Sequence, residues 1–219
     1  LEVSRSPTLS ATGSHRAGSP LTVTYYGRLA PPPAGPDFRL AVLPDTQNYT
    51  ASLGGGTPAM FLAQADWIAT NRAANNIVFA AHMGDSSQDG DSAPAQWRNA
   101  TNALYRLENP GTTLLPEGLP YGASVGNHDQ YPTADPNGTT TNFNLYFGEA
   151  HFGGRGYYGG HYGTNNDNYY TLFSPSGLEF IDLFMEYNAS PGADVLNWAN
   201  SLLQTHSTRR GIVVCHSIL

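Results

Sequence analysis

The alternation of strand and helix patterns between residues 37 and 125 constrains the fold of this chain most. Apolar runs at residues 38–43, 77–81 and 121–125 have the length and composition of buried strands. Apolar residues at helical spacing fill the intervals, at residues 58–76 and at about 95–107. The first of these helices has Thr57 as an N-cap and Pro58 at its first position. The order strand, helix, strand, helix, strand predicts a parallel sheet covered by helices.

The last third of the chain predicts a second sheet. Residues 169–173 and 178–183 are strand-like runs separated by a Ser-Pro-Ser-Gly turn, which predicts a β-hairpin. Residues 193–205 have helical spacing, and residues 212–215 form a last apolar strand. Between the two halves, residues 130–168 are rich in Gly, Asn, Thr and aromatic residues. We expect a long insertion there that is functional or partly disordered.

The first 36 residues have a different composition from the rest. Ser, Thr, Gly and Pro dominate, with one strand-like run at residues 21–26 and a proline-rich spacer at residues 31–36. We interpret residues 1–36 as an arm, or as the tail of a preceding β-rich module, followed by a linker. Residues 37–219 are then the main domain.

Polar residues follow the predicted strands at the point where each strand ends. Asp45, Asp85, Asn127 and His216 all lie in such positions. The carboxyl ends of parallel strands meet at one edge of a sheet, where ligands bind in folds of this class. Gly126 precedes Asn127. A Cβ at residue 126 would crowd the backbone where the strand becomes a loop, so the turn requires glycine.

Carboxylate, amide and imidazole groups at these positions suit two divalent metal ions. Asp85 is the natural bridging ligand, because a carboxylate can present one oxygen to each ion. Asp45 and Gln47 would bind one ion, and Asn127 and His216 the other. Two such ions could activate a bridging water and hold the oxygens of a phosphate group.

The residues next to Asn127 predict the acid–base chemistry. His128 is placed to protonate a leaving alkoxide, and Asp129 is expected to fix the orientation of the His128 ring. His82 lies inside a strand end, so we interpret it as a packed or hydrogen-bonded histidine and not as a ligand. The sequence assigns no substrate-binding residue.

These motifs, in this order, resemble those of the calcineurin-like metallophosphoesterase family. The resemblance covers residue 37 to the end of the chain and rests on Asp45-Thr46-Gln47, Gly84-Asp85, Gly126-Asn127-His128-Asp129 and His216. It implies a four-layer α/β/β/α sandwich and metal-dependent hydrolysis of phosphomonoesters or phosphodiesters. It also implies that Asp45, Asp85, Asn127 and His216 are metal ligands and that His128 is the catalytic proton donor. The metals it implies are Mn, Zn, Fe or Mg.

The chain departs from the family pattern in two places. Gln47 stands where the family usually has histidine, and an amide oxygen is a weaker, neutral ligand. The final Gly-His-x-His motif of the family is absent, since the sequence stops three residues after His216. We therefore expect a catalytic domain truncated at its C-terminus, whose site is completed by a segment outside this sequence or is poorly metallated. Truncation would also leave a sheet edge unpaired, which favours association with another chain.

Composition excludes or disfavours several classes of protein. The formal net charge is −7, there is no lysine, and all ten basic residues are arginine, so a nucleic-acid-binding protein is disfavoured. No apolar run is long enough to span a membrane. The single cysteine, Cys215, excludes a disulfide framework. Many Tyr, Asn, Gly and Thr residues with few charges favour a secreted or extracytoplasmic protein, and the resemblance implies a small phosphoester as substrate.

A binding or scaffold module is the alternative to an enzyme. In that case the sandwich persists, the missing motif abolishes turnover, and the loops rich in Tyr and Gly bind carbohydrate or a partner protein. The tyrosines at residues 157–158, 162 and 169–170 would either line a cleft or pack beneath the long insertion. Trp67, Trp97 and Trp198 lie on predicted helices, and we expect them to anchor the core.

Overall fold

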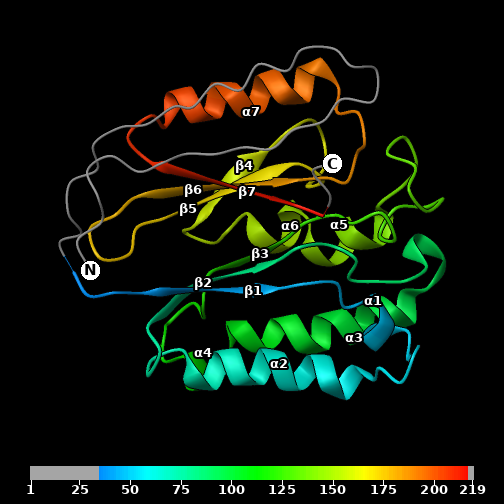
Figure 1. The fold of residues 1–219 in the computed structure, drawn as a ribbon, viewed down its shortest axis with the longest axis horizontal. Helices are drawn as coiled ribbons and strands as arrows, with labels where there is room; N and C mark the ends of the chain where they lie inside the picture. Colours follow the sequence, from blue (N-terminus) through cyan, green and yellow to red (C-terminus); the bar gives the residue numbers. More distant parts are fainter. Residues whose placement is uncertain (1–34, 217–219) are drawn as a thin grey trace, which may run out of the picture. The chain divides into compact units, whose positions relative to one another are not determined.

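A parallel sheet forms the first half of the domain in the computed structural model, which describes residues 35–216. Within these residues its strands are β1 (Arg39–Leu43), β2 (Ile77–His82) and β3 (Tyr121–Ala123), in the order β1-β2-β3. Both pairings are parallel, with Leu43 opposite His82 and His82 opposite Ala123. The prediction of a parallel sheet is therefore confirmed (Figure 1). The predicted N-terminal arm lies outside the described residues except for Gly35 and Pro36.

Helices α2 (Pro58–Asn71) and α3 (Pro94–Leu104) cover one face of this sheet (Figure 1). As predicted, Thr57 is the N-cap of α2 and Pro58 its first residue, but the helix ends at Asn71, before the predicted end at residue 76. Short helices lie in the connections: α1 (Gln47–Thr50), the 3-10 turns η1 (Gly90–Ser92) and η2 (Tyr105–Glu108), and α4 (Pro110–Thr113). The core on this face includes Phe61, Ala65 and Ile68 of α2 and Trp97, Ala100 and Leu104 of α3.

The second sheet contains β4 (Tyr158–His161), β5 (Tyr169–Phe173), β6 (Phe180–Met185) and β7 (Arg210–Cys215), in the order β4-β5-β6-β7. The predicted hairpin is confirmed as the antiparallel pair β5–β6, with Thr171 opposite Asp182. Strand β7 is parallel to β6. Helix α7 (Ala193–Thr205) has the predicted bounds and covers the outer side of this sheet (Figure 1).

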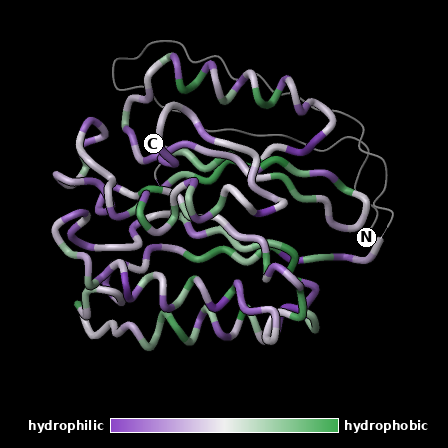
Figure 2. The backbone as a smooth tube through the Cα atoms, turned by 180° about the vertical axis from the view of Figure 1, so that it is seen from behind, coloured by the Kyte–Doolittle hydropathy of each residue, from purple (hydrophilic) through white to green (hydrophobic). Residues whose placement is uncertain are grey.

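An aromatic core joins the two sheets. The rings of Phe79 on β2 and Phe173 on β5 stack with their centroids 4.6 Å apart. Gly122 on β3 allows a close approach of the two sheets, because a Cβ at this residue would lie 2.3 Å from Cζ of Phe184. The layers follow the order helix, sheet, sheet, helix, as expected for an α/β/β/α sandwich (Figure 1). Hydrophobic residues follow the strands of both sheets, and hydrophilic residues dominate the connecting loops (Figure 2).

The segment predicted as a long insertion contains three short regular elements. It forms α5 (Thr141–Phe147), α6 (Glu149–Phe152) and β4. Phe143 and Phe147 are fully buried and pack against the Trp97 ring, with centroids 6.2 and 6.4 Å from it. No helix was predicted in this segment, and the spacing of Phe143 and Phe147 by four residues was the signal for α5.

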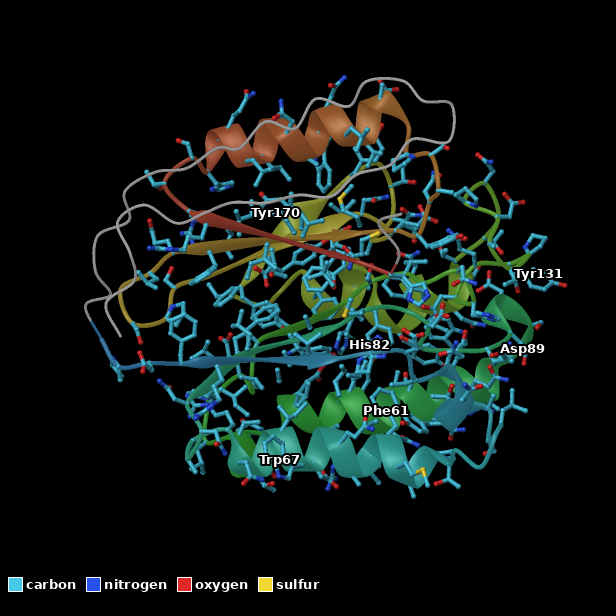
Figure 3. All side chains as sticks on the ribbon, viewed as in Figure 1. Phe61, Trp67, His82, Asp89, Tyr131 and Tyr170 are labelled. Atoms are coloured by element: carbon cyan, nitrogen blue, oxygen red, sulfur yellow. The ribbon has the colours of Figure 1, made fainter. Side chains whose placement is uncertain are left out.

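Only one of the three tryptophans is a core anchor. Trp97 is fully buried and donates from Nε1 to the Gly90 carbonyl (2.8 Å). Trp67 is 56% exposed, and Figure 3 shows it on the outer helices away from Phe61. Trp198 is half-buried on α7, a helix that buries no residue fully. The predictions for Trp67 and Trp198 were wrong, because the face of α2 that carries Trp67 is exposed and Trp198 is covered only in part, by the rings of Tyr162 and Tyr170 (centroids 5.7 and 6.4 Å away). Among residues 35–216, no helix is both long and apolar enough to span a membrane.

Candidate metal centre

The loops that follow β1, β2, β3 and β7 gather polar side chains at one end of the sheets. Asp45 follows β1, Asp85 follows β2, Asn127 follows β3, and His216 directly follows β7. Of these residues, ligand atoms of Asp45, Asp85 and His216 all lie within 4.8 Å of one another. This is the spacing at which three side chains can contact a single metal ion. Three strand ends from both sheets therefore converge on one point.

His216 connects the two carboxylates of this cluster. Its Nε2 lies 3.2 Å from Asp85 Oδ2, and its Nδ1 lies 3.6 Å from Asp45 Oδ1 and 3.2 Å from the Met83 carbonyl oxygen. The hydrogen bond to Asp85 raises the pKa of His216 above its usual value, and the charges of both carboxylates add to this effect. Two carboxylates around one imidazole stabilise a positive charge at this point, whether a proton or a metal carries it.

The backbone at Asp85 is strained. Asp85 has φ of 55° and Gly84 has φ of 102°, both in the left-handed region. Gly126 packs directly against Asp85, because a Cβ at this residue would lie 2.1 Å from Asp85 Oδ1. This contact confirms that the turn requires glycine. A non-glycine residue in this conformation costs roughly 1–3 kcal/mol and is typical of functional sites.

Gln47 offers an oxygen with no partner. Its Nε2 donates to Asp85 Oδ2 (3.0 Å), which turns the amide toward the cluster. Among the described residues nothing donates to its Oε1, although that atom is buried. A buried acceptor without a donor costs roughly 1–3 kcal/mol, and a cation at this point would satisfy it. The residues present therefore fit a divalent ion.

The loop after β3 encloses Asp85. The backbone nitrogen of His128 donates to Asp85 Oδ1 (2.9 Å), and Asn127, the residue between Gly126 and His128, is half-buried beside it. The His128 ring is fixed through Nδ1, which lies 2.9 Å from the carbonyl oxygen of Gln88. Nδ1 also lies 3.1 Å from Gln88 Nε2, so Gln88 occupies this nitrogen and Nε2 is the ring nitrogen left for proton transfer.

The structure corrects the role predicted for Asp129. Its carboxylate does not contact the His128 ring but accepts hydrogen bonds from the backbone nitrogens of Ser86 (3.2 Å), Ser87 (2.8 Å) and Gly126 (2.9 Å). Burial raises the pKa of Asp129 to about 7, with the Asp85 charge as the second cause. Asp129 therefore clamps the loop after β2 to the loop after β3 and acts on His128 only through these loops. The position of Asp129 next to His128 in the sequence did not reveal this role, because the carboxylate bonds backbone groups of residues 86, 87 and 126.

His82 is a structural residue, as predicted. It is 1% exposed, and burial lowers its pKa to about 4. Its Nε2 donates to Thr46 Oγ1 (2.9 Å), and its Nδ1 accepts from the Gly84 nitrogen (3.3 Å). The neutral ring thus holds the loops after β1 and β2 together below the cluster. Figure 3 shows His82 between the helices and the second sheet.

The structural roles of two glutamines near the site were not predicted from the sequence. The Gln96 Oε1 accepts from the backbone nitrogens of Gln88 (2.7 Å) and Asp89 (3.2 Å), and so positions the carbonyl that holds His128. Gln130 is fully buried, and its Nε2 donates to Glu186 Oε1 and to the Tyr187 carbonyl, both at 2.8 Å. Glutamine in a loop carries no pattern of its own, so only the fold reveals these roles.

The tyrosines considered as a cleft lining belong mainly to the core. Tyr169 is fully buried and exchanges hydrogen bonds with the Ala123 backbone, donating from its hydroxyl to the carbonyl (2.9 Å). Tyr157 is 6% exposed, and Tyr158 is half-buried with its ring near that of Phe152. Packing beneath the segment 130–168, the second interpretation of these residues, agrees with their burial.

The chain is similar in sequence to one known protein and in structure to another. No protein-family model matches it. In sequence, it is similar to the uncharacterized protein YvnB of Bacillus subtilis (strain 168), with 32% identity over 188 residues, or 86% of this chain. The chain spans 13% of the length of that relative. In structure, it is similar to a dimetal phosphatase from Danio rerio, with a TM-score of 0.42 and 13% sequence identity over 82% of this chain and 69% of that one.

Proposed function

We propose that this chain hydrolyses phosphoesters with the help of two divalent cations held by the loops after β1, β2, β3 and β7. The observation that carries the proposal is the convergence of Asp45, Asp85 and His216 within 4.8 Å of one another, from three strand ends far apart in sequence. Gln47 and Asn127 complete the proposed ligand set. Small phosphomonoesters and phosphodiesters are the proposed substrates, because an acidic chain with a net charge of −7 disfavours a polyanionic one.

The donor chemistry supports hard or borderline cations. Carboxylate and amide oxygens with one imidazole suit Mn, Zn, Fe or Mg. Asp85 is nearly fully buried at the centre of the cluster and would hold the cations together with Asp45 and His216. Two divalent cations bound here would supply a water of lowered pKa and would neutralise charge on the phosphate oxygens.

His128 is the proposed general acid. Its ring is held through Nδ1 by the Gln88 carbonyl, so Nε2 is oriented to donate a proton to the leaving alkoxide. The same residue contributes its backbone N–H to Asp85 Oδ1. The acid and the proposed bridging carboxylate are thereby fixed relative to each other. Asp129 maintains this arrangement from beneath through its three backbone hydrogen bonds.

The test is hydrolysis of 4-nitrophenyl phosphate and of bis(4-nitrophenyl) phosphate by the purified chain with Mn or Zn added. Asp85→Asn and His128→Ala are expected to lower kcat by about 100-fold or more, since each removes a group required at the reacting centre. Asp37→Asn and His206→Ala are matched controls at residues away from the cluster, and both should retain activity. Isothermal titration with Mn then separates the two roles, because Asp85→Asn should lose metal binding and His128→Ala should keep it.

Two results would contradict the proposal. One is a folded chain that hydrolyses neither ester with Mn or with Zn. The other is turnover that survives Asp85→Asn. Comparing the two esters also decides between phosphatase and phosphodiesterase, because a monoesterase releases nitrophenol from the first ester much faster than from the second.

A further inference from the structure

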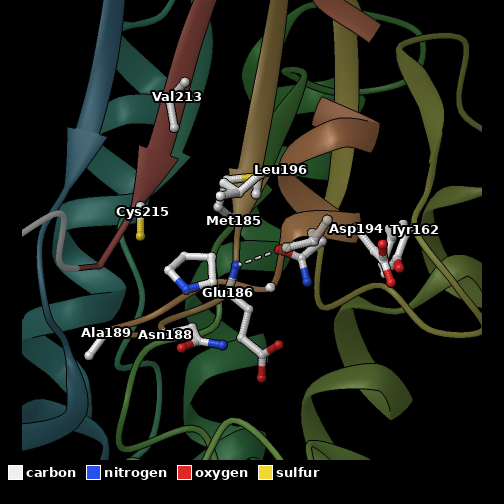
Figure 4. Close-up of a pocket in the computed structure, with 13 residues that line it drawn as sticks. Tyr162, Met185, Glu186, Asn188, Ala189, Asp194, Leu196, Val213 and Cys215 are labelled. Carbon is white, nitrogen blue, oxygen red and sulfur yellow. Dashed lines mark hydrogen bonds between the residues drawn. The ribbon is translucent and has the colours of Figure 1, made fainter. Parts of the chain in front are cut away.

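A cavity of about 490 Å³ lies between the first turn of α7 and the carboxyl ends of β6 and β7 (Figure 4). This volume is within the roughly 300–1,000 Å³ typical of small-molecule sites. One side of the cavity is apolar and is formed by Met185, Val195, Leu196 and Val213. Leu196 is 49% exposed and Val213 is 52% exposed, so this apolar side is open to a ligand.

The polar side of the cavity is acidic. Glu186 and Asp194 contribute carboxylates, and Tyr162 and Asn188 contribute a phenol and an amide. Among the described residues that line the cavity, none is basic. An anionic ligand would therefore meet like charge here, whereas a cation or a group rich in hydrogen-bond donors would meet acceptors.

Glu186 is held in a fixed position. Its Oε1 accepts from Gln130 Nε2 (2.8 Å), and its backbone nitrogen donates to Asn168 Oδ1 (3.1 Å), the bond drawn in Figure 4. Burial raises the pKa of Glu186 to about 7, with the charge of Asp167 as the second cause. Burial disfavours the ionised form of this carboxylate, so a cationic partner would stabilise that form.

The cavity is linked to the proposed metal centre by residues that are consecutive in the chain. Cys215 lines the cavity, and His216 is the next residue. Tyr187, which follows Glu186, places its ring 6.1 Å from that of His216 and donates from its nitrogen to the Val125 carbonyl (2.8 Å). A ligand in the cavity therefore lies against the segment that contacts the metal-binding histidine.

We propose that this cavity binds the organic group of the substrate, and that this group is compact, partly apolar and carries an amine cation placed against Glu186. The assignment of this group to a substrate rests on the proposed phosphoesterase function. The ligand class itself rests on the apolar side, the two carboxylates and the lack of basic residues among the described residues that line the cavity. The phosphate of such an ester would lie outside the cavity, at the cations, where its charge is compensated.

Binding is tested first, without turnover. Benzylamine, benzyl alcohol and benzoate are titrated into the metal-free chain, and amide and methyl shifts are followed by NMR. Benzylamine should shift the signals of Leu196 and Val213 and bind about tenfold tighter than the alcohol, the effect of one charged hydrogen bond. Benzoate should not bind. Glu186→Gln should remove the preference for the amine, and Leu196→Trp should block all binding.

Matched substitutions elsewhere control for general effects. Glu149→Gln and Leu145→Trp change the same residue types at exposed positions on α6 and α5 and should bind benzylamine like the parent chain. Equal binding of amine and alcohol would overturn the proposal, as would a preference for the amine that survives both Glu186→Gln and Leu196→Trp.

Turnover is tested second, with Mn present. The chain should hydrolyse 4-(aminomethyl)phenyl phosphate with kcat/KM about tenfold above that for 4-(hydroxymethyl)phenyl phosphate, mainly through KM, and Glu186→Gln should bring this ratio toward one. A ratio of one in the parent chain overturns the assignment of the cavity to the substrate. If no ester is hydrolysed while the NMR preference holds, the phosphoesterase function fails and the ligand class of the cavity is supported.

Discussion

Replacing Asp182 by asparagine should change the pH dependence of stability. Asp182 on β6 is 1% exposed. It lies on the same face of the strand as Phe180 and Phe184, which belong to the core between the sheets. Among the described residues its Oδ1 has no hydrogen-bond partner, and neither has Oγ1 of Thr171, the residue opposite on β5. Burial therefore raises the pKa of Asp182 from 3.8 to about 7.

The sign and size of the effect follow from this pKa. Below about pH 4 the carboxyl is protonated in both the folded and the unfolded chain and costs nothing through ionisation. Between about pH 4 and 7 only the unfolded chain releases the proton, so the free energy of unfolding falls by roughly 1.4 kcal/mol per pH unit. Above about pH 7 the loss levels off at on the order of 4 kcal/mol. Asparagine does not ionise, so the variant should escape this loss.

The assay is urea unfolding of the parent chain and of Asp182→Asn at pH 4, 6 and 8, followed by tryptophan fluorescence. The other buried acids titrate in both proteins, so the difference between the two isolates Asp182. The variant should gain on the order of 4 kcal/mol relative to the parent between pH 4 and pH 8, whatever the fixed cost of the buried amide. Asp37→Asn, at an exposed residue, should show no such change. A difference between parent and variant that is the same at all three pH values would refute the reasoning.

Three further predictions test the packing and the site. Gly122→Ala should lower the free energy of unfolding in urea by about 1–3 kcal/mol, because its Cβ would overlap the Phe184 ring. Trp97→Ala should lower it by about 3–5 kcal/mol, and Trp67→Ala at the exposed position by no more than about 0.5 kcal/mol; equal losses would contradict the assigned burial. Gln47→Ala should weaken Mn binding in calorimetry by roughly tenfold or more, whereas Gln47→His should strengthen it, and unchanged affinity in both would exclude Gln47 as a ligand.

The sequence by itself determined the layered α/β architecture and the location of the candidate site. Strand and helix periods are local properties of the chain, so β2, the β5–β6 hairpin and α7 were predictable from residue spacing. The site was predictable for a topological reason. Polar residues at the ends of parallel strands meet at one edge, which brings Asp45 and Asp85 together after β1 and β2. His216 follows β7 of the second sheet, so its contact with Asp85 depends on how the two sheets pack.

Tertiary structure alone decided the partners of each side chain. Asp129 follows His128 directly, yet its carboxylate bonds the loop after β2, because partners are set by where the backbone turns and not by sequence distance. The exposure of Trp67 and the open oxygen of Gln47 depend likewise on which neighbouring element packs against each residue. The cavity beside Glu186 is formed by three segments that no sequence pattern relates, so only their packing could reveal it.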